Sequence, residues 1–376
     1  MPATDVQIPD WFSAENEGGG IAVADLLNNG QKDVVVFMVD APPGPNRGLF
    51  RIGRNLNGAG QVTNGWTPWI DVPDWFSWQN QGAGIAVGDL DHDGKQELVA
   101  FMIDKGATQN QGYYRVGKGL DMNGNITQGW GPWIPIPDWF SRDNQHGSIA
   151  LADLDGDGNL ELFVIMVDNP AERNRGLYRI GRQLDTNGTV TGGWTPWIDV
   201  PDWFSWENQG AGITVLETPG RHDLIVFMVD NAAEQNQAFY KIGKNLDLNG
   251  KVAGGWSPWR GVPAWFSWEN QGSSITAMSL NGTPSMAVMV VDNPPGQNSG
   301  RYRVLPLDDN PRRDGQWQLL PYHSGVLAVH AALLPQGKVL FFAGSGSSPV
   351  RFASPDFGNV AKGIFTSVVW DPQAAT

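Results

Sequence analysis

The sequence has no cysteine among its 376 residues, which excludes disulfides, thiolate metal sites and a thiol nucleophile. Charged residues are scarce at 17%, and 39 acidic against 25 basic side chains give a formal net charge of −14. This excess of negative charge argues against nucleic acid or an anionic membrane as a partner. No apolar run reaches the length of a membrane span, so membrane insertion is not expected. The segment MPATDVQIPDWF also lacks the pattern of a signal peptide.

Glycine (48) and tryptophan (18) are abundant, and both belong largely to a tandem repeat. A phrase of the type PDWFSWENQG starts at Pro9, Pro73, Pro137, Pro201 and Pro263, at spacings of 64, 64, 64 and 62 residues. Three further markers keep step with it: GWTPW, FMVD and LFRIG with their variants. A fixed period of this kind indicates stacked copies of one structural unit.

Each unit contains four short runs of apolar, aromatic and β-branched residues between Gly, Asn, Asp and Pro. In the second unit these runs are residues 84–90, 97–104, 112–120 and 129–136. Asn-Gly pairs such as MNGN at 122–125 are typical of tight hairpins. Helical periodicity is missing. Four antiparallel strands in tandem units predict the blades of an all-β propeller.

The C-terminal segment predicts a further, incomplete blade. Residues 325–334, 338–345 and 363–372 read as three strands, and the N-terminal DVQIP at 5–9 matches the outer strand of a preceding blade. We therefore predict a single domain over 1–376. It would be a six-bladed β-propeller of four-stranded antiparallel blades, with five repeats over 9–317 and a last blade closed by the N-terminal strand. Such closure removes exposed strand edges.

The stretch ADLDGDGNLEL at 152–162 resembles the calcium loop of the FG-GAP/VCBS propeller repeat family, which includes integrin α-chain heads and several lectins. Alternate carboxylates on a tight turn converge on one point, and calcium is held by several oxygens at such a point. The resemblance implies structural Ca²⁺ in units two and three. The implied ligands are Asp89, Asp91, Asp93 and Glu97, and Asp153, Asp155, Asp157 and Glu161. The alternative is an acidic hairpin that holds no ion.

The other units depart from this pattern. Unit one keeps Asp25, Asn29 and Asp33 but has Leu27 at the second ligand position, which predicts at most a weak site. Units four and five have lost the set and predict plain turns. The segment HAALLPQGKVLFFAGS resembles a blade of kelch and galactose-oxidase-type propellers, but their copper-radical chemistry needs a cysteine that this chain lacks. Calcium loops favour an extracellular or secreted location.

The repeated phrase has an architectural and a functional interpretation. Its first Trp and Phe predict wedges between blades. The second Trp stands where unit three has Arg142, so that position is expected to be exposed. An exposed indole beside amides suits a sugar ring. The predicted ligand-binding residues are Trp78, Asn80, Gln81, Asp104, Asn110, Trp206, Asn208, Gln209, Asp230, Asn236, Trp268, Asn270, Gln271, Asp292 and Asn298. The Asp and Asn side chains equally suit pairing with one another to pin the loop.

From these observations we predict a carbohydrate-binding, lectin-like propeller with several equivalent weak sites on one face, whose partners are glycans or glycoconjugates. The alternative is a protein-interaction scaffold, one module of a larger secreted or toxin-like protein. An enzyme with its site in the central channel is the third hypothesis. It ranks last because the five histidines do not cluster at metal-ligand spacing. The sequence does not indicate the oligomeric state.

Overall fold

The computed structural model contains strands and no helices in its described part. It describes residues 5–307, except 14–15, 42–45, 78, 106–108, 170–173, 206–207, 219, 232–235, 264, 266–269, 281 and 293–297. It also describes residues 330–333, 339–342 and 367–370. Among these residues no helix is long and apolar enough to cross a membrane. Contacts divide the chain into two units, Met1–Asp308 and Asp309–Thr376.

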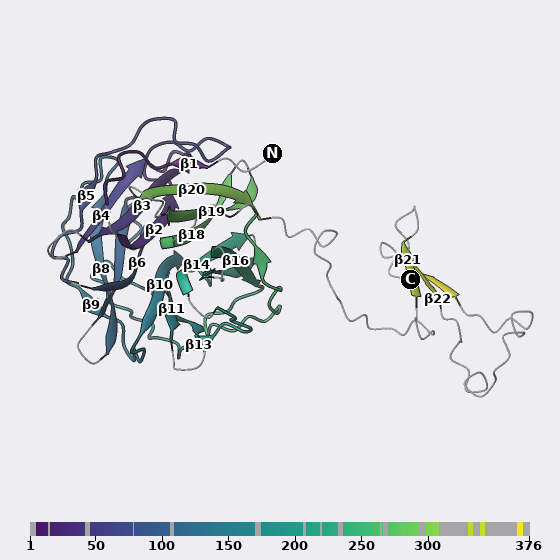
Figure 1. Cartoon of the computed structure of the whole chain (residues 1–376). Coiled ribbons are helices and arrows are strands. Elements are labelled where there is room, and N and C mark those ends of the chain that lie inside the picture. The colour runs from purple at the N-terminus through teal and green to yellow at the C-terminus, as the bar shows by residue number, and fades with distance from the viewer. Residues whose placement is uncertain are drawn as a thin grey trace, which may run out of the picture. The chain divides into compact units, whose positions relative to one another are not determined.

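The first unit is a five-bladed propeller of four-stranded antiparallel sheets (Figure 1). The first three blades are β2(Asn16–Ala24), β3(Asp33–Asp40), β4(Arg47–Gly53) and β5(Ile70–Asp71); β6(Asn80–Gly88), β7(Gln96–Lys105), β8(Asn110–Leu120) and β9(Ile134–Pro135); and β10(Asn144–Ala152), β11(Glu161–Asp168), β12(Arg175–Gly181) and β13(Ile198–Asp199). The fourth blade is β14(Asn208–Thr218), β15(Arg221–Asn231), β16(Asn236–Gly243) and β17(Arg260–Gly261). The fifth is β18(Asn270–Leu280), β19(Thr283–Asp292), β20(Ser299–Pro306) and β1(Val6–Gln7).

The prediction of six blades is wrong, because the N-terminal strand closes the fifth blade. Val6 pairs with Tyr302 of β20, and Ile8, which is fully buried, donates its amide to the Gly300 carbonyl at 2.9 Å. The innermost strands β2, β6, β10, β14 and β18 contact one another in a closed ring. The idea of closure by the N-terminus was right, but it applies to a different blade.

Small residues at the axis allow a ring of only five blades. Gly20, Gly84, Ser148, Gly212 and Ser274 occupy the same position of the innermost strands. The hydroxyl oxygens of Ser148 and Ser274, from non-adjacent blades, lie 3.3 Å apart and are buried. Larger side chains there would hold the strands apart, since interiors are close-packed.

The second unit contains a three-stranded sheet and is described separately. Its strands are β21(His330–Leu333), β22(Val339–Phe342) and β23(Ser367–Trp370), paired antiparallel in that order. These strands fall within the three runs predicted for the last blade. The predicted partner, residues 5–9, belongs to the fifth blade instead. The assignment of residues 1–376 to one domain remains a prediction.

The core of the propeller lies between blades. The second strand of each blade is apolar on both faces, as in Val34–Val39, where every residue is fully buried. Each hydrophobic cluster joins side chains of two neighbouring blades, for example Phe37 of the first with Ile85 of the second. The first Trp of the repeated phrase extends these interfaces, so the prediction that it acts as a wedge is confirmed; Phe12, Phe76 and Phe140, which were predicted to do the same, are exposed. Trp75 and Trp133, for instance, pack edge to face at 5.4 Å.

A buried cation, which the sequence reasoning missed, holds each junction together. Arg179 is 2% exposed and donates hydrogen bonds to the Thr195 carbonyl and to the Pro137 carbonyl of the repeated phrase. Its guanidinium also lies over the rings of Trp194 and Trp197, at 4.9 and 5.2 Å. The equivalent cations are Arg51, Arg115, Lys241 and Arg303. A basic residue inside the apolar LYRIG marker was the available signal.

Candidate functional site

The structure brings the repeated Asn and Asp positions together within the sheet. The first Asn of each inner strand stands opposite the Asp that ends the second strand. These pairs are Asn16 with Asp40, Asn80 with Asp104, Asn144 with Asp168, Asn208 with Asp230 and Asn270 with Asp292. The loop residues Asn110, Asn236 and Asn298 are only 1–2% exposed. Buried side chains of this kind are typical of loop pinning.

The remaining predicted ligand residues are described only in part. Trp78, Trp206 and Trp268 lie outside the described residues, as do the side chains of the Asn-Gln pairs beside them. Asp104 and Asp230 are partly exposed and Asp292 is buried. Arg142, which marks the second-Trp position in the third blade, is exposed as expected. A ligand role for these residues stays a prediction.

The acidic turns, residues 25–33, 89–97 and 153–161, connect the first and second strands of blades one to three. In the second turn, carboxylate oxygens of Asp89, Asp91 and Glu97 lie within 4.8 Å of one another. In the third turn the same is true of Asp153, Asp155 and Asp157. The structure therefore gathers most of the predicted metal ligands. Asp93 and Glu161 are outside these two sets.

The last acidic residue of each turn is buried and pins the backbone. Glu97 accepts the amides of Leu90 at 2.8 Å and Gly119 at 3.2 Å, so it ties the turn to the end of the third strand. Glu161 accepts the amide of Leu154 at 2.9 Å. Burial, and then repulsion from Asp155 and Asp153, raises the pKa of Glu161 to about 7.

The same pin is present in blades that lack the calcium pattern. Asp33 of blade one accepts the amide of Asn55 at 2.8 Å, and Asp223 of blade four accepts the amide of Asn245 at 3.0 Å. The acid at this position therefore has a structural role whether or not an ion binds.

The second turn nonetheless fits a calcium ion. One carboxylate oxygen of Asp89 accepts the Gly94 amide at 3.0 Å. Its other oxygen, Oδ1, is buried and has no hydrogen-bond partner among the described residues. A buried carboxylate oxygen beside further carboxylates is costly unless a proton or a cation is present. Hard oxygen donors without nitrogen or sulfur favour calcium or magnesium.

Blades four and five have shorter turns at this end of the propeller. The interval from the first position of the turn to the pin is eight in blade one (Asp25 to Asp33) but six in blade four (Glu217 to Asp223). The long turns of blades one and two touch, since Asn28 Nδ2 donates to the Gly94 carbonyl at 2.6 Å. A groove of about 780 Å³ lies instead where the third acidic turn faces blade four.

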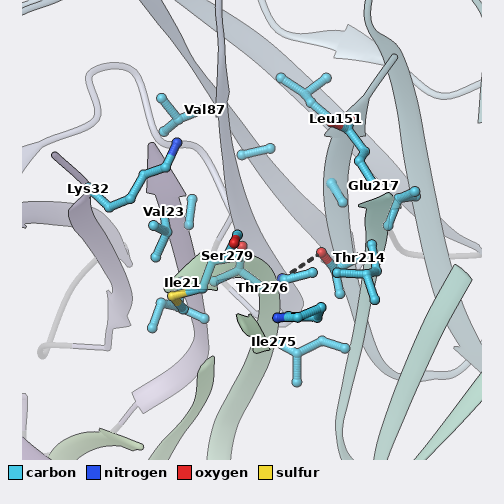
Figure 2. A pocket seen from close by; sticks show the side chains of 18 of the residues that line it. Ile21, Val23, Lys32, Val87, Leu151, Thr214, Glu217, Ile275, Thr276 and Ser279 are labelled. Atoms are coloured by element: carbon cyan, nitrogen blue, oxygen red, sulfur yellow. Dashed lines mark hydrogen bonds between the residues drawn. The ribbon is translucent and has the colours of Figure 1, made fainter. Parts of the chain in front are cut away.

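A central pocket of about 450 Å³ lies at the same end of the axis. Its walls come from the inner strands of all five blades and are mainly aliphatic. Its polar side chains come from three of the blades: Lys32 from blade one, Thr214, Glu217 and Thr218 from blade four, and Thr276 and Ser279 from blade five. Figure 2 shows Lys32 and Glu217 at opposite sides of the pocket, with Ser279 and Thr276 between them.

The polar residues of the central pocket break the repeat. Glu217 stands where the acidic turns begin with aspartate, and blade five has Ser279 at this position. Lys32 stands where the other blades have Gln96, Leu160, His222 and Pro284. The Glu217 carboxylate accepts the amide of Asp153 at 3.2 Å, which orients it. Thr214 accepts the Ala277 amide at 2.9 Å across the fourth junction.

Sequence reasoning missed this pocket, because it treated the fourth and fifth turns as plain. The available signal was the set of positions at which otherwise similar units differ. A site assembled from polar residues of three different blades has no local motif.

No protein-family model matches the chain, and no curated protein matches it. Solved structures share the fold at low identity. A thermostable family-43 glycoside hydrolase has 10% identity and a TM-score of 0.42, covering 81% of this chain and 93% of its own. An α-L-arabinofuranosidase from Lactobacillus brevis has 13% identity and a TM-score of 0.45, and the match covers 81% of this chain and 96% of that protein. An α-L-arabinanase from Penicillium chrysogenum has 11% identity and a TM-score of 0.44, and the match covers 82% of this chain and 99% of that protein. At these values the similarity concerns the fold alone.

Three predictions from the sequence are corrected here. No family model supports the FG-GAP/VCBS resemblance or the kelch-like one, and the propeller has five blades instead of the expected six, so both assignments are wrong. The prediction of a lectin with several equivalent sites and the alternative of a scaffold are corrected as well. The side chains of Asn110, Asn236, Asn298 and Asp292, which were expected to line those sites, are buried.

Proposed function

We propose that the chain is a carbohydrate-acting enzyme with a single active site in the central pocket. The observation that carries this proposal is the break in the repeat: five near-copies surround one pocket, but only blades one, four and five place polar side chains in it, and these differ. Architecture needs equivalent residues at equivalent positions, as the buried cations show. A catalytic site needs different groups on its different sides.

The pocket suits an uncharged sugar unit. Its volume of about 450 Å³ is in the range of small-molecule sites, and it combines aliphatic walls with hydroxyls. The hydroxyls of Thr276 and Ser279 match those of a sugar, and the aliphatic walls match its C–H face. The structural neighbours are named as enzymes of glycan breakdown, which agrees with a glycan as the partner in general.

Glu217 is the one carboxylate and Lys32 the one ammonium among the described residues lining the pocket. In the proposed hydrolysis, water attacks the anomeric carbon while Glu217 takes a proton from that water. The bond from this carbon to the leaving oxygen breaks, and Lys32 donates a proton to that oxygen. Their places on opposite sides of the pocket suit groups that act on opposite faces of a sugar ring.

The groove beside the third acidic turn gives a longer glycan a path out of the pocket. Asp155 and His222 are among its lining residues, and Asp155 follows two residues after Asp153, whose amide holds Glu217. We propose that the units beyond the cleaved bond lie there.

The test is turnover of a panel of plant and microbial oligosaccharides by the whole chain. Glu217→Gln is expected to lower kcat by about 100-fold or more with an unchanged melting temperature. Asp25→Asn, the matched position in blade one, lies outside the central pocket and is expected to retain activity. Equal activity of Glu217→Gln and the unaltered chain, or no cleavage of any oligosaccharide, would overturn the proposal.

We also propose structural Ca²⁺ in the second and third acidic turns. The buried Asp89 oxygen and the two carboxylate clusters support this proposal. In the second turn Asp89, Asp91 and Glu97 would hold the ion, and in the third Asp153, Asp155 and Asp157. The ion would offset the repulsion among these acids and stiffen the turns beside the groove.

A further inference from the structure

A pocket lies at the junction between blades four and five, where the described residues depart from the repeat. We call the first Trp of each repeated phrase the junction tryptophan. At four junctions it lies against a glycine of the preceding blade's third strand. A Cβ added to that glycine would lie 2.2–2.4 Å from the indole: Gly48 with Trp75, Gly112 with Trp139, Gly176 with Trp203 and Gly300 with Trp11. These rings therefore lie flat on the backbone.

The fourth blade has Ala238 at this position, and its junction tryptophan is Trp265. The Ala238 methyl group occupies the space that the indole fills elsewhere, so Trp265 cannot lie as close to the strand. Trp265 keeps its contact with Phe227, at 6.0 Å between ring centroids, as Trp139 does with Phe101 at 6.4 Å.

The outer edge of this junction also lacks the ion pair that is present in blades one and three. In blades one and three an ion pair spans the same site: Arg47 with Asp71 at 2.6 Å and Arg175 with Asp199 at 2.7 Å. In blade two the Gln111 amide donates to the Ile136 carbonyl at 2.8 Å. In blade four the corresponding residues are Gln237 and Gly261, which cannot form the ion pair of blades one and three.

These departures coincide with a pocket of about 340 Å³, which we call the junction pocket. It is lined by Asn236, Gln237, Ala238, Phe239, Gly261, Val262 and Trp265. No charged side chain occurs among these described residues, although the chain carries a net charge of −14. The walls combine two aromatic rings with an aliphatic side chain, and Gln237 and Gly261 are exposed at its edge.

We propose that the junction pocket binds a small, neutral, planar aromatic molecule of the indole or phenol class. The walls argue for a flat aromatic ring, because two aromatic side chains, Trp265 and Phe239, line the pocket without any charged group. A ring in this pocket would gain aromatic contacts with Trp265 and Phe239. The exposed Gln237 amide would meet one N–H or O–H group at the edge. This site is independent of the central pocket and of the reaction proposed there.

The test is a titration of the whole chain with indole, in which binding is measured by ligand-observed NMR and by calorimetry. Ala238→Gly restores the residue of the other four blades and lets Trp265 close onto the strand. We expect it to weaken indole binding at least tenfold while the chain stays folded. Glu217→Gln, in the central pocket, is the matched control and should leave indole affinity unchanged.

Two further probes make the outcome decisive. Cyclohexanol, which is not planar, and methyl glucoside, which is polar on its edges, should bind more weakly than indole. Equal indole affinity in Ala238→Gly and the unaltered chain would overturn the proposal. Tighter binding of methyl glucoside than of indole, or loss of indole binding in Glu217→Gln, would do so too.

Discussion

Two regions of the propeller teach opposite lessons about its repeat. At the first three junctions the same residues recur and make the same contacts: an indole on a glycine, a buried cation on two carbonyls, a bridge across the edge. In the sector of blades four and five the turns shorten, the glycine becomes Ala238 and the bridge is lost. The junction pocket lies in that second region, and so do most of the polar side chains of the central pocket. The residues that recur in every unit hold the blades together, and the residues that depart from the repeat line the candidate binding pockets.

The largest effect is expected from a repeated junction residue. Arg179→Ala leaves the Pro137 and Thr195 carbonyls without their donor inside the junction and opens a cavity under two indoles. We expect the free energy of unfolding to fall by about 3–5 kcal/mol, measured by urea denaturation. Arg179→Lys should cost about 1 kcal/mol, because Lys241 fills this place in blade four. An alanine variant within 1 kcal/mol of the unaltered chain would show that the cation is dispensable.

Calcium should separate the acidic turns from the short ones. If the second and third turns bind the ion, calcium at about 100 times its Kd stabilises the fold by about 2.7 kcal/mol per site, and EDTA removes this gain. Thermal melts with both additions measure it. Asp89→Asn combined with Asp153→Asn should abolish the calcium response and, in EDTA, melt no lower than the unaltered chain, since charge repulsion is relieved. A melting temperature that is the same with calcium and with EDTA would contradict the proposal.

A third test uses His146, which breaks the repeat on β10. The other blades have Gly18, Gly82, Gly210 and Gly272 at this position. Both ring nitrogens of His146 lack a hydrogen-bond partner among the described residues, and burial lowers its pKa from 6.5 to about 4. The unfolded chain therefore binds more protons below pH 6.5, and stability falls as pH decreases from 6.5 towards 4.

At pH 5 this loss amounts to about 2 kcal/mol relative to pH 7.5. Glu161, whose raised pKa has the opposite effect, titrates in the same range, so the comparison must be between variants. His146→Gly keeps Glu161 and removes only the histidine. Urea denaturation at both pH values should show a smaller loss on acidification in this variant. Parallel pH profiles of the two chains would rule out the buried histidine as the cause.

The strands were predictable because each carries its own local signal. The runs around residues 84–90 and 97–104 are apolar and bounded by turn residues, and the structure has β6 and β7 there. The number of blades was not predictable in this way. The outer strand of the fifth blade is set by the long-range pairing of Val6 with Tyr302, which no local signal reveals. Close approach at the axis, seen in Ser148 and Ser274, also involves residues far apart in sequence.

The candidate sites divide along the same line. The acidic turns were found because their carboxylates lie within nine residues, and the structure gathers Asp153, Asp155 and Asp157 as predicted. The central pocket was missed because Lys32 and Glu217 are 185 positions apart and neither belongs to a motif. Only the closed ring brings them to one pocket. The role of the buried Arg179 was missed for a different reason. Its motif was recognised as a strand from the apolar residues in it, and the basic residue among them was given no role.

The smallest effect is expected where the missing bridge is rebuilt. Gln237→Arg with Gly261→Asp gives blade four the pair that Arg175 and Asp199 form in blade three, where both side chains are about half exposed. Exposed ion pairs contribute about 0.2–1 kcal/mol, so the coupling from a double-mutant cycle should fall in that range and weaken in high salt. The same cycle on Arg175 and Asp199 is the control. A coupling of zero in blade four, beside a measurable one in blade three, would mean that Ala238 and Trp265 have moved the edge of the sheet out of reach. The difference between the two regions would then lie in the backbone as well as in the side chains.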